Sequence, residues 1–102
     1  MLKKGYIIKP HFYDKFQERA KNHFPKMRHK NIFHKVANIM RNVDNLEDLF
    51  CHKRTYFLPV KLSRNGEKQF YIIIKDDKKY LALVSIYTED MFLKRYGNKI
   101  KH

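Results

Sequence analysis

The sequence has few of the residues that build disulfide frameworks, turns and linkers. Its 102 residues include one cysteine, three glycines and three prolines. A lone cysteine, Cys51, cannot form an internal disulfide and supplies no thiolate cluster for a metal, so it indicates a reducing compartment. No low-complexity segment, linker or internal repeat is visible. We therefore expect one domain over residues 1–102.

Long apolar runs are also missing. The longest, such as "FYIII" at residues 70–74, falls far short of the roughly 20 residues that a membrane-spanning helix needs. The start of the chain, "MLKKGYIIKPHF", has basic residues but lacks the apolar core of a signal peptide. These features predict a cytoplasmic protein without a membrane partner.

Acidic residues are too few to balance the basic ones. Lys and Arg total 23 against 10 Asp and Glu, which gives a formal net charge of +13. The cations occur in every segment, and a small fold with this excess repels itself unless a polyanionic partner compensates. Nucleic acid is the leading candidate. An anionic membrane comes second, but the apolar stripes are expected to face a core and not a bilayer.

Hydrophobic periodicity divides the chain into a helical half and a strand half. A short strand at residues 5–9 ends at Pro10, which suits the first turn of a helix over residues 10–24. A second helical pattern covers residues 25–43, and residues 44–50 follow as a cap or short extra turn. The hydrophobic share of 43% is enough for a core.

After residue 53 the hydrophobic period changes to two. Strands are expected at residues 54–63, 68–74 and 80–88, the first two joined by an Asn65–Gly66 hairpin. A last helix at residues 89–97 begins after Thr88 and ends at Gly97. The order predicts an α+β fold: a short N-terminal strand, two helices on one face of an antiparallel sheet of three to four strands, and a short C-terminal helix.

The second sheet face is expected to be free and to carry the function. Alternation along the last strand places Ala82, Val84 and Ile86 on the helix side. Alternation along the three strands assigns to the free face a set of polar and aromatic residues, together with two leucines: Lys61, Tyr71, Lys75, Leu81, Leu83, Ser85 and Tyr87. Lysines and tyrosines on one sheet face are suited to binding phosphates and stacking bases.

Three polar side chains share one flank of the first helix. His11, Lys15 and Arg19 follow each other at four-residue steps, beside an apolar stripe that includes Phe12 and Phe16. Such a row is either a solvated edge or one wall of an anion-binding cleft.

The residue types present favour RNA cleavage without a metal or a cofactor. The carboxylates are scattered, and the histidines lack the spacing of a metal site. Cleavage through the 2′-hydroxyl needs a proton acceptor, cations that stabilise the phosphorane-like state, and a donor for the leaving oxygen. His11 suits the proton transfer, Arg19 and Lys61 the phosphate, and Ser85 with Tyr87 the reacting group. The residues expected to bind the nucleic acid are Lys15, Arg54, Lys61, Arg64, Tyr71 and Lys75.

Two stretches, "IIKPHFYDKFQERA" and "LVSIY", resemble motifs of the small ribonuclease toxins and phage nucleases of the barnase–EndoU–colicin–RelE superfamily. The resemblance implies catalytic or phosphate-binding roles for His11, Arg19, Ser85 and Tyr87, although serine stands where threonine is commoner. RelE-like members use sheet cations, for which Arg54, Lys61, Arg64 and Lys75 are the local candidates. No second catalytic histidine is identified. The one histidine at a plausible position for that role is His52, which lies just before the expected hairpin.

This resemblance implies partners as well as an activity. A toxin of this kind acts on RNA, such as tRNA or ribosome-bound mRNA, and normally requires an acidic antitoxin or immunity protein. Two alternatives remain open: a non-catalytic nucleic-acid- or ribosome-binding regulator of phage or mobile-element origin, and a docking surface for an acidic host protein. His11→Ala separates an enzyme from the first alternative, because only an enzyme has an activity to lose. The salt dependence of nucleic-acid binding separates the second, because only the affinity of a phosphate binder falls steeply with salt.

Overall fold

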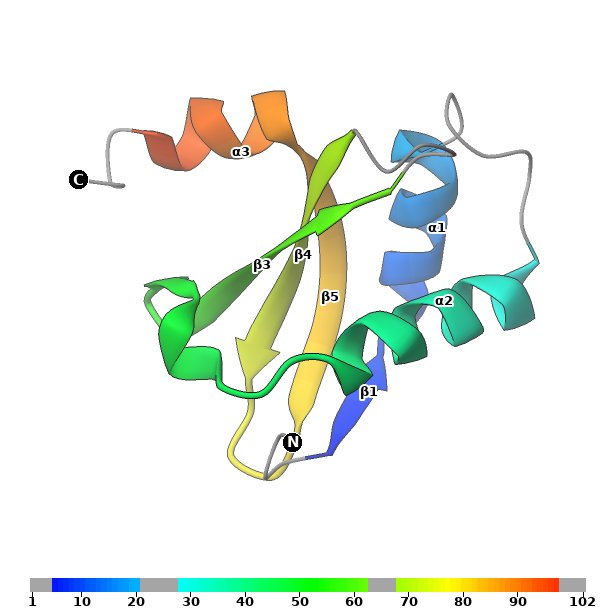
Figure 1. The fold of residues 1–102 in the computed structure, drawn as a ribbon, viewed down its shortest axis with the longest axis horizontal. Coiled ribbons are helices and arrows are strands. Elements are labelled where there is room, and N and C mark those ends of the chain that lie inside the picture. Colours follow the sequence, from blue (N-terminus) through cyan, green and yellow to red (C-terminus); the bar gives the residue numbers. More distant parts are fainter. Residues whose placement is uncertain (1–4, 21–27, 63–67, 98–102) are drawn as a thin grey trace.

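The computed structural model describes residues 5–20, 28–62 and 68–97, which form a mixed sheet with helices on both faces (Figure 1). The elements follow in the order β1 (Tyr6–Ile8), α1 (Pro10–Arg19), α2 (His29–Arg41), the 3₁₀ turn η1 (Leu46–Asp48), β2 (Phe50–His52), β3 (Thr55–Lys61), β4 (Gln69–Asp76), β5 (Leu81–Thr88) and α3 (Glu89–Tyr96). The predicted α+β class and the order of the main elements are confirmed.

The sheet has five strands in the order β1-β5-β4-β3-β2. β1 lies parallel to β5, and the other neighbours are antiparallel. The sheet therefore has more strands than the three to four expected, and the parallel β1 makes it mixed. The additional strand is β2, which lies at the end of the 44–50 stretch expected as a cap. The predicted Asn65–Gly66 turn lies outside the described residues, but β3 and β4 pair as a hairpin would require.

Two helices cover one face of the sheet, as expected. Pro10 occupies the first turn of α1, where a missing N–H removes no helical hydrogen bond. Phe12 and Phe16 of α1 are fully buried, as is Val36 of α2. α1 ends at Arg19 and α2 begins at His29, so both helices are shorter than predicted within the described ranges.

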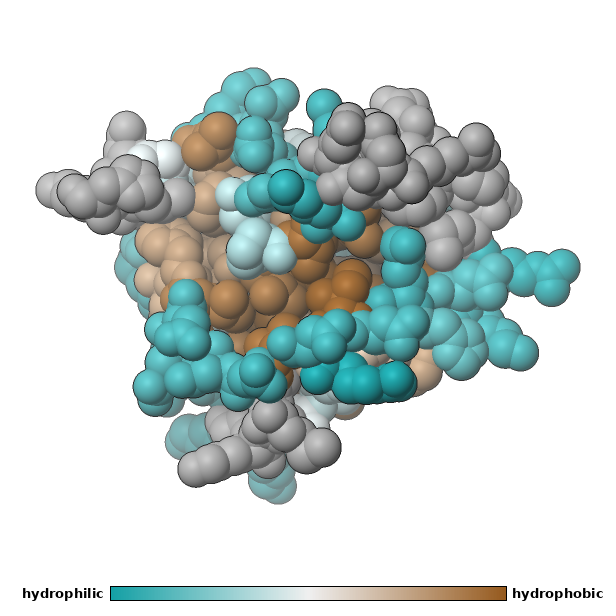
Figure 2. All heavy atoms as spheres, in the orientation of Figure 1, coloured by the Kyte–Doolittle hydropathy of each residue, from teal (hydrophilic) through white to brown (hydrophobic). Residues whose placement is uncertain are grey.

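The main core lies between these helices and the sheet. Its buried residues are Phe12, Phe16, Ala20, Ile32, Val36, Met40, Val43, Leu58, Val60, Leu62, Phe70, Ile72, Ile74, Leu81, Leu83 and Ile86. Figure 2 shows apolar residues gathered across the middle of the same view, with hydrophilic residues around them. Burial of this one continuous apolar set is the principal driving force for folding.

A β-bulge in β5 changes which of its residues face the helices. Ile73 pairs with Ser85 and Ile74 pairs with Leu83, which leaves Val84 as an extra residue. Leu81 and Leu83 consequently lie in the main core with no exposed surface, and their assignment to the second face was wrong. A strict period of two cannot represent the extra residue, although Ser85 was assigned to the correct face.

The second face is partly covered, contrary to expectation. α3 begins after Thr88, whose hydroxyl accepts a hydrogen bond from the Met91 amide at 3.3 Å, and it turns back over the sheet. Phe92 is 1% exposed and stacks on Tyr71, with ring centroids 3.9 Å apart. This smaller core also contains Phe57 and Ile73. Within the described ranges, no helix has the length and apolar character needed to cross a membrane.

Candidate nucleic-acid interface and active site

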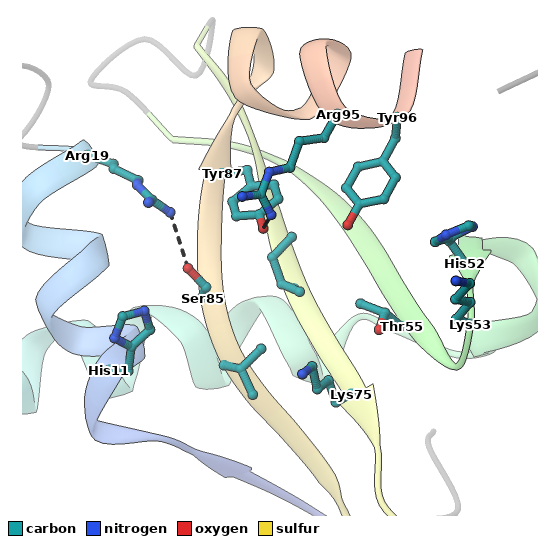
Figure 3. Close-up of a pocket in the computed structure, with 12 residues that line it drawn as sticks. His11, Arg19, His52, Lys53, Thr55, Lys75, Ser85, Tyr87, Arg95 and Tyr96 are labelled. Atoms are coloured by element: carbon teal, nitrogen blue, oxygen red, sulfur yellow. Dashed lines mark hydrogen bonds between the residues drawn. The ribbon is translucent and has the colours of Figure 1, made fainter. Parts of the chain in front are cut away.

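A cleft of about 520 Å³ opens on the second sheet face beside α3 (Figure 3). Its size falls within the range of small-molecule and substrate sites. It is lined by residues from both ends of the chain, contributed by α1, four strands, the β2–β3 turn and α3: His11, Arg19, His52, Lys53, Thr55, Ile73, Lys75, Val84, Ser85, Tyr87, Arg95 and Tyr96.

The lining is strongly cationic. Arg19, Lys53, Lys75 and Arg95 contribute four positive charges, and none of the residues that line the cleft is an aspartate or a glutamate. In the described parts of the chain, no group of three or more His, Cys, Asp or Glu residues is placed to hold a metal ion. Cations concentrated in a concave surface attract polyanions and raise their local concentration.

Two histidines stand on opposite sides of this cleft (Figure 3). His11 is the second residue of α1 and lies on the exposed flank beside the buried Phe12. His52 is the last residue of β2, at the start of the turn into β3. Its ring centroid lies 5.6 Å from that of Tyr96. The cleft therefore has one imidazole on each side.

The bulge in β5 sets the floor of the cleft. It directs both Val84 and Ser85 toward the opening, and Ser85 is only 9% exposed. Arg19, at the end of α1, donates from Nη1 to the Ser85 hydroxyl at 3.2 Å and to the Ile86 carbonyl. These bonds join the last turn of α1 to β5 directly after the bulge.

Tyr87 lies beside two arginines. The Arg95 guanidinium donates to the Tyr87 hydroxyl at 3.0 Å, and its central carbon lies 5.6 Å from the ring centroid. The Arg19 guanidinium lies 5.5 Å from the same centroid. Cations at this distance from an aromatic ring are held by its quadrupole.

The β2–β3 turn has an unusual backbone conformation. Lys53 and Arg54 both have positive φ, at 50° and 65°, and they join the paired residues His52 and Thr55. A two-residue hairpin with both central residues left-handed is a type I′ turn, which prefers asparagine and glycine. Lys53 and Arg54 both have a Cβ, so this backbone conformation is strained for them. The turn nevertheless brings Lys53 to the cleft.

Five residues singled out by sequence reasoning meet in the cleft: His11, Arg19, Lys75, Ser85 and Tyr87. Four others lie outside it. Lys15 pairs with Glu18 at 3.2 Å, and Tyr71 is stacked under α3. Arg54, in the β2–β3 turn, and Lys61, the last residue of β3, are exposed and do not line the cleft. Arg64 lies outside the described residues.

Sequence reasoning missed Lys53, Thr55, Arg95 and Tyr96 and left His52 without a role. The β2–β3 turn could not be foreseen because "KR" carries no type I′ signal. The helical spacing of Phe92, Arg95 and Tyr96 could have shown that α3 directs one face toward the sheet. Outside the cleft, burial raises the pKa of Tyr13 and of Tyr56, with Tyr6 and Cys51 respectively adding to these shifts.

Comparison of the chain with protein-family models, with curated proteins and with solved structures gives no match.

Proposed function

We propose that this protein is a cytoplasmic RNA-binding protein that cleaves RNA in the cleft, through the 2′-hydroxyl and without a metal ion. One observation carries the proposal: His11 and His52 line opposite sides of a cleft whose described lining residues include four cations and no carboxylate. Histidine titrates close to neutral pH, so one imidazole can accept a proton while the other donates one.

The reaction is a transesterification at one phosphodiester. One histidine takes the proton of the 2′-hydroxyl, and the 2′-oxygen forms a bond to the adjacent phosphorus. The bond from phosphorus to the 5′-oxygen breaks, and the other histidine protonates that oxygen. The products are a 2′,3′-cyclic phosphate and a 5′-hydroxyl, so atoms and charge balance without an added reactant.

The cations supply the remaining chemistry. Negative charge accumulates on the phosphate oxygens as the phosphorus becomes five-coordinate, and fixed positive groups stabilise this state most strongly where carboxylates are absent. Lys75 of β4 and Lys53 of the turn reach the cleft from the sheet side. The Ser85 and Tyr87 hydroxyls lie on its floor and can position the phosphate.

The test uses defined RNA in excess EDTA, with the products separated on a denaturing gel. We expect cleavage by the wild-type protein, and loss of about 100-fold or more in rate for His11→Ala and for His52→Ala. His34→Ala is the matched control, because His34 is exposed on α2 and does not line the cleft. An RNA with one 2′-deoxy nucleotide should resist cleavage at that position only.

Each result has a distinct meaning. Cyclic phosphate ends that disappear in both cleft variants, but not in His34→Ala, support the mechanism. Intact RNA that still binds with a steep salt dependence would reject cleavage and leave a non-catalytic RNA-binding protein. Absence of both cleavage and binding would reject the proposal completely.

The same cleft suits a protein inhibitor. A toxin with this activity requires a partner that neutralises it, and the excess of cations favours an acidic antitoxin or immunity protein. Such a partner would cover the cleft by charge complementarity and would compete with RNA.

A further inference from the structure

The two arginines of the cleft differ in how they are held. Arg19 is bound to the Ser85 hydroxyl and the Ile86 carbonyl, so one of its guanidinium nitrogens is occupied by the protein itself. Arg95 is exposed, and it donates to the hydroxyl of another side chain, that of Tyr87. Arg19 is therefore attached to the main chain of β5, whereas, among the described residues, Arg95 is held by the side chain of Tyr87 through its hydroxyl and its ring.

Both guanidinium groups nevertheless approach the same phenol ring, at 5.5 and 5.6 Å from its centroid. Two like charges near one ring repel each other, and no carboxylate among the lining residues offsets them. Arg19 has two neutral acceptors, the Ser85 hydroxyl and the Ile86 carbonyl, and Arg95 has one, the Tyr87 hydroxyl; among the described lining residues no negative charge compensates either arginine. An anion between them removes this repulsion.

We propose that Arg19, Arg95 and Tyr87, with the Ser85 hydroxyl, form a subsite for one phosphate group, in which Arg95 is the principal ligand-binding residue and Arg19 the fixed wall. The proposal rests on the proposed function for placing an RNA phosphate in this cleft. It requires binding alone, however, and holds whether or not the RNA is cleaved.

The donors favour a tetrahedral oxyanion over a carboxylate. They approach from two helices and one strand, and thus from several directions, whereas a planar carboxylate is satisfied by a single guanidinium fork. Two arginines also supply positive charge on both sides of the bound group, enough for the single negative charge of an RNA phosphodiester and for inorganic phosphate. Lysines at these positions would supply the charge without the two-pronged geometry.

Inorganic phosphate is the probe that tests this subsite without RNA. It is titrated into the protein at constant ionic strength, and the arginine side-chain Nε–H signals are followed by NMR. We expect saturable shifts of Arg19 and Arg95. Arg95→Gln should weaken binding about tenfold or more, because charge-assisted hydrogen bonds are lost. Tyr87→Phe, which removes the hydroxyl that holds Arg95, should weaken it less.

Lys94→Gln is the matched control, since Lys94 is the neighbouring exposed cation of α3 and does not line the cleft. It should leave the phosphate affinity within about twofold. Equal weakening by Lys94→Gln and Arg95→Gln would show a general charge effect and overturn the proposal. Equal binding of acetate and phosphate would also overturn it.

The two proposals fail separately. RNA cleavage without phosphate binding at Arg95 would reject the phosphate subsite and leave the proposed ribonuclease activity in place. Phosphate binding at Arg95 by a protein that leaves RNA intact would reject the proposed ribonuclease activity and support the phosphate subsite.

Discussion

Arg19 donates from a single guanidinium nitrogen to both the hydroxyl of Ser85 and the main-chain carbonyl of Ile86. These partly buried bonds join the end of α1 to β5 at the point where the bulge has shifted the alternation of the strand. The helix that carries His11 and the strand that forms the cleft floor are thus held as one unit.

Because of the Arg19 bonds, substitution of Arg19 should destabilise the protein more than substitution of an ordinary surface cation does. Arg19→Lys keeps the charge but cannot reproduce both bonds, and we expect the free energy of unfolding to fall by about 1–3 kcal/mol. Lys15→Gln on the same helix removes only a solvent-exposed ion pair and should change it by about 0.5 kcal/mol or less. Urea denaturation of both variants measures the difference. Equal effects would show that the Arg19 bonds contribute no more than the surface pair.

The strained β2–β3 turn predicts a substitution that stabilises the protein. Glycine adopts positive φ readily, so Arg54→Gly should raise the free energy of unfolding by about 0.5–1 kcal/mol. The same replacement at Lys61, an exposed cation within β3, should lower it because glycine weakens a regular strand. Thermal and urea unfolding give the sign of each change. A loss of stability in both variants would contradict the strain assigned to the turn.

The attachment of α3 predicts a large effect from one buried ring. Phe92 is 1% exposed and contacts both Tyr71 and Phe57, so Phe92→Ala should cost about 3–5 kcal/mol. Leu93 is 50% exposed, and Leu93→Ala should cost about 0.5 kcal/mol or less. Near-UV circular dichroism with urea unfolding checks both. Because α3 carries Arg95, a folded Phe92→Ala protein should also bind phosphate more weakly.

Local pattern was sufficient for the helical layer and for part of the site. His11 and Arg19 are two four-residue steps apart, beside Phe12 and Phe16, which placed both polar side chains along one edge of the core, and both line the cleft. Thr88 was correctly predicted to begin the last helix. These features depend on neighbours within one or two turns, which the sequence contains directly.

The rest of the site depends on contacts between distant segments. The β5 bulge is defined by its pairing with β4, so the strand alone could not show that Leu83 and Ser85 face opposite sides. His52 and Lys53 reach the cleft where β2 enters a strained turn with no typical sequence. Arg95 reaches it because Phe92 docks on Tyr71. In each case tertiary packing decides the position of the residue.

The parallel pairing of β1 with β5 has a consequence during synthesis. Residues 6–8 can join the sheet only beside residues 81–83, and α1 docks mainly on that same late strand. A nascent chain on the ribosome therefore holds His11 and Arg19 long before it has a cleft for them to line. The cleft can therefore form only after β5 has been synthesised and has paired with both β1 and β4.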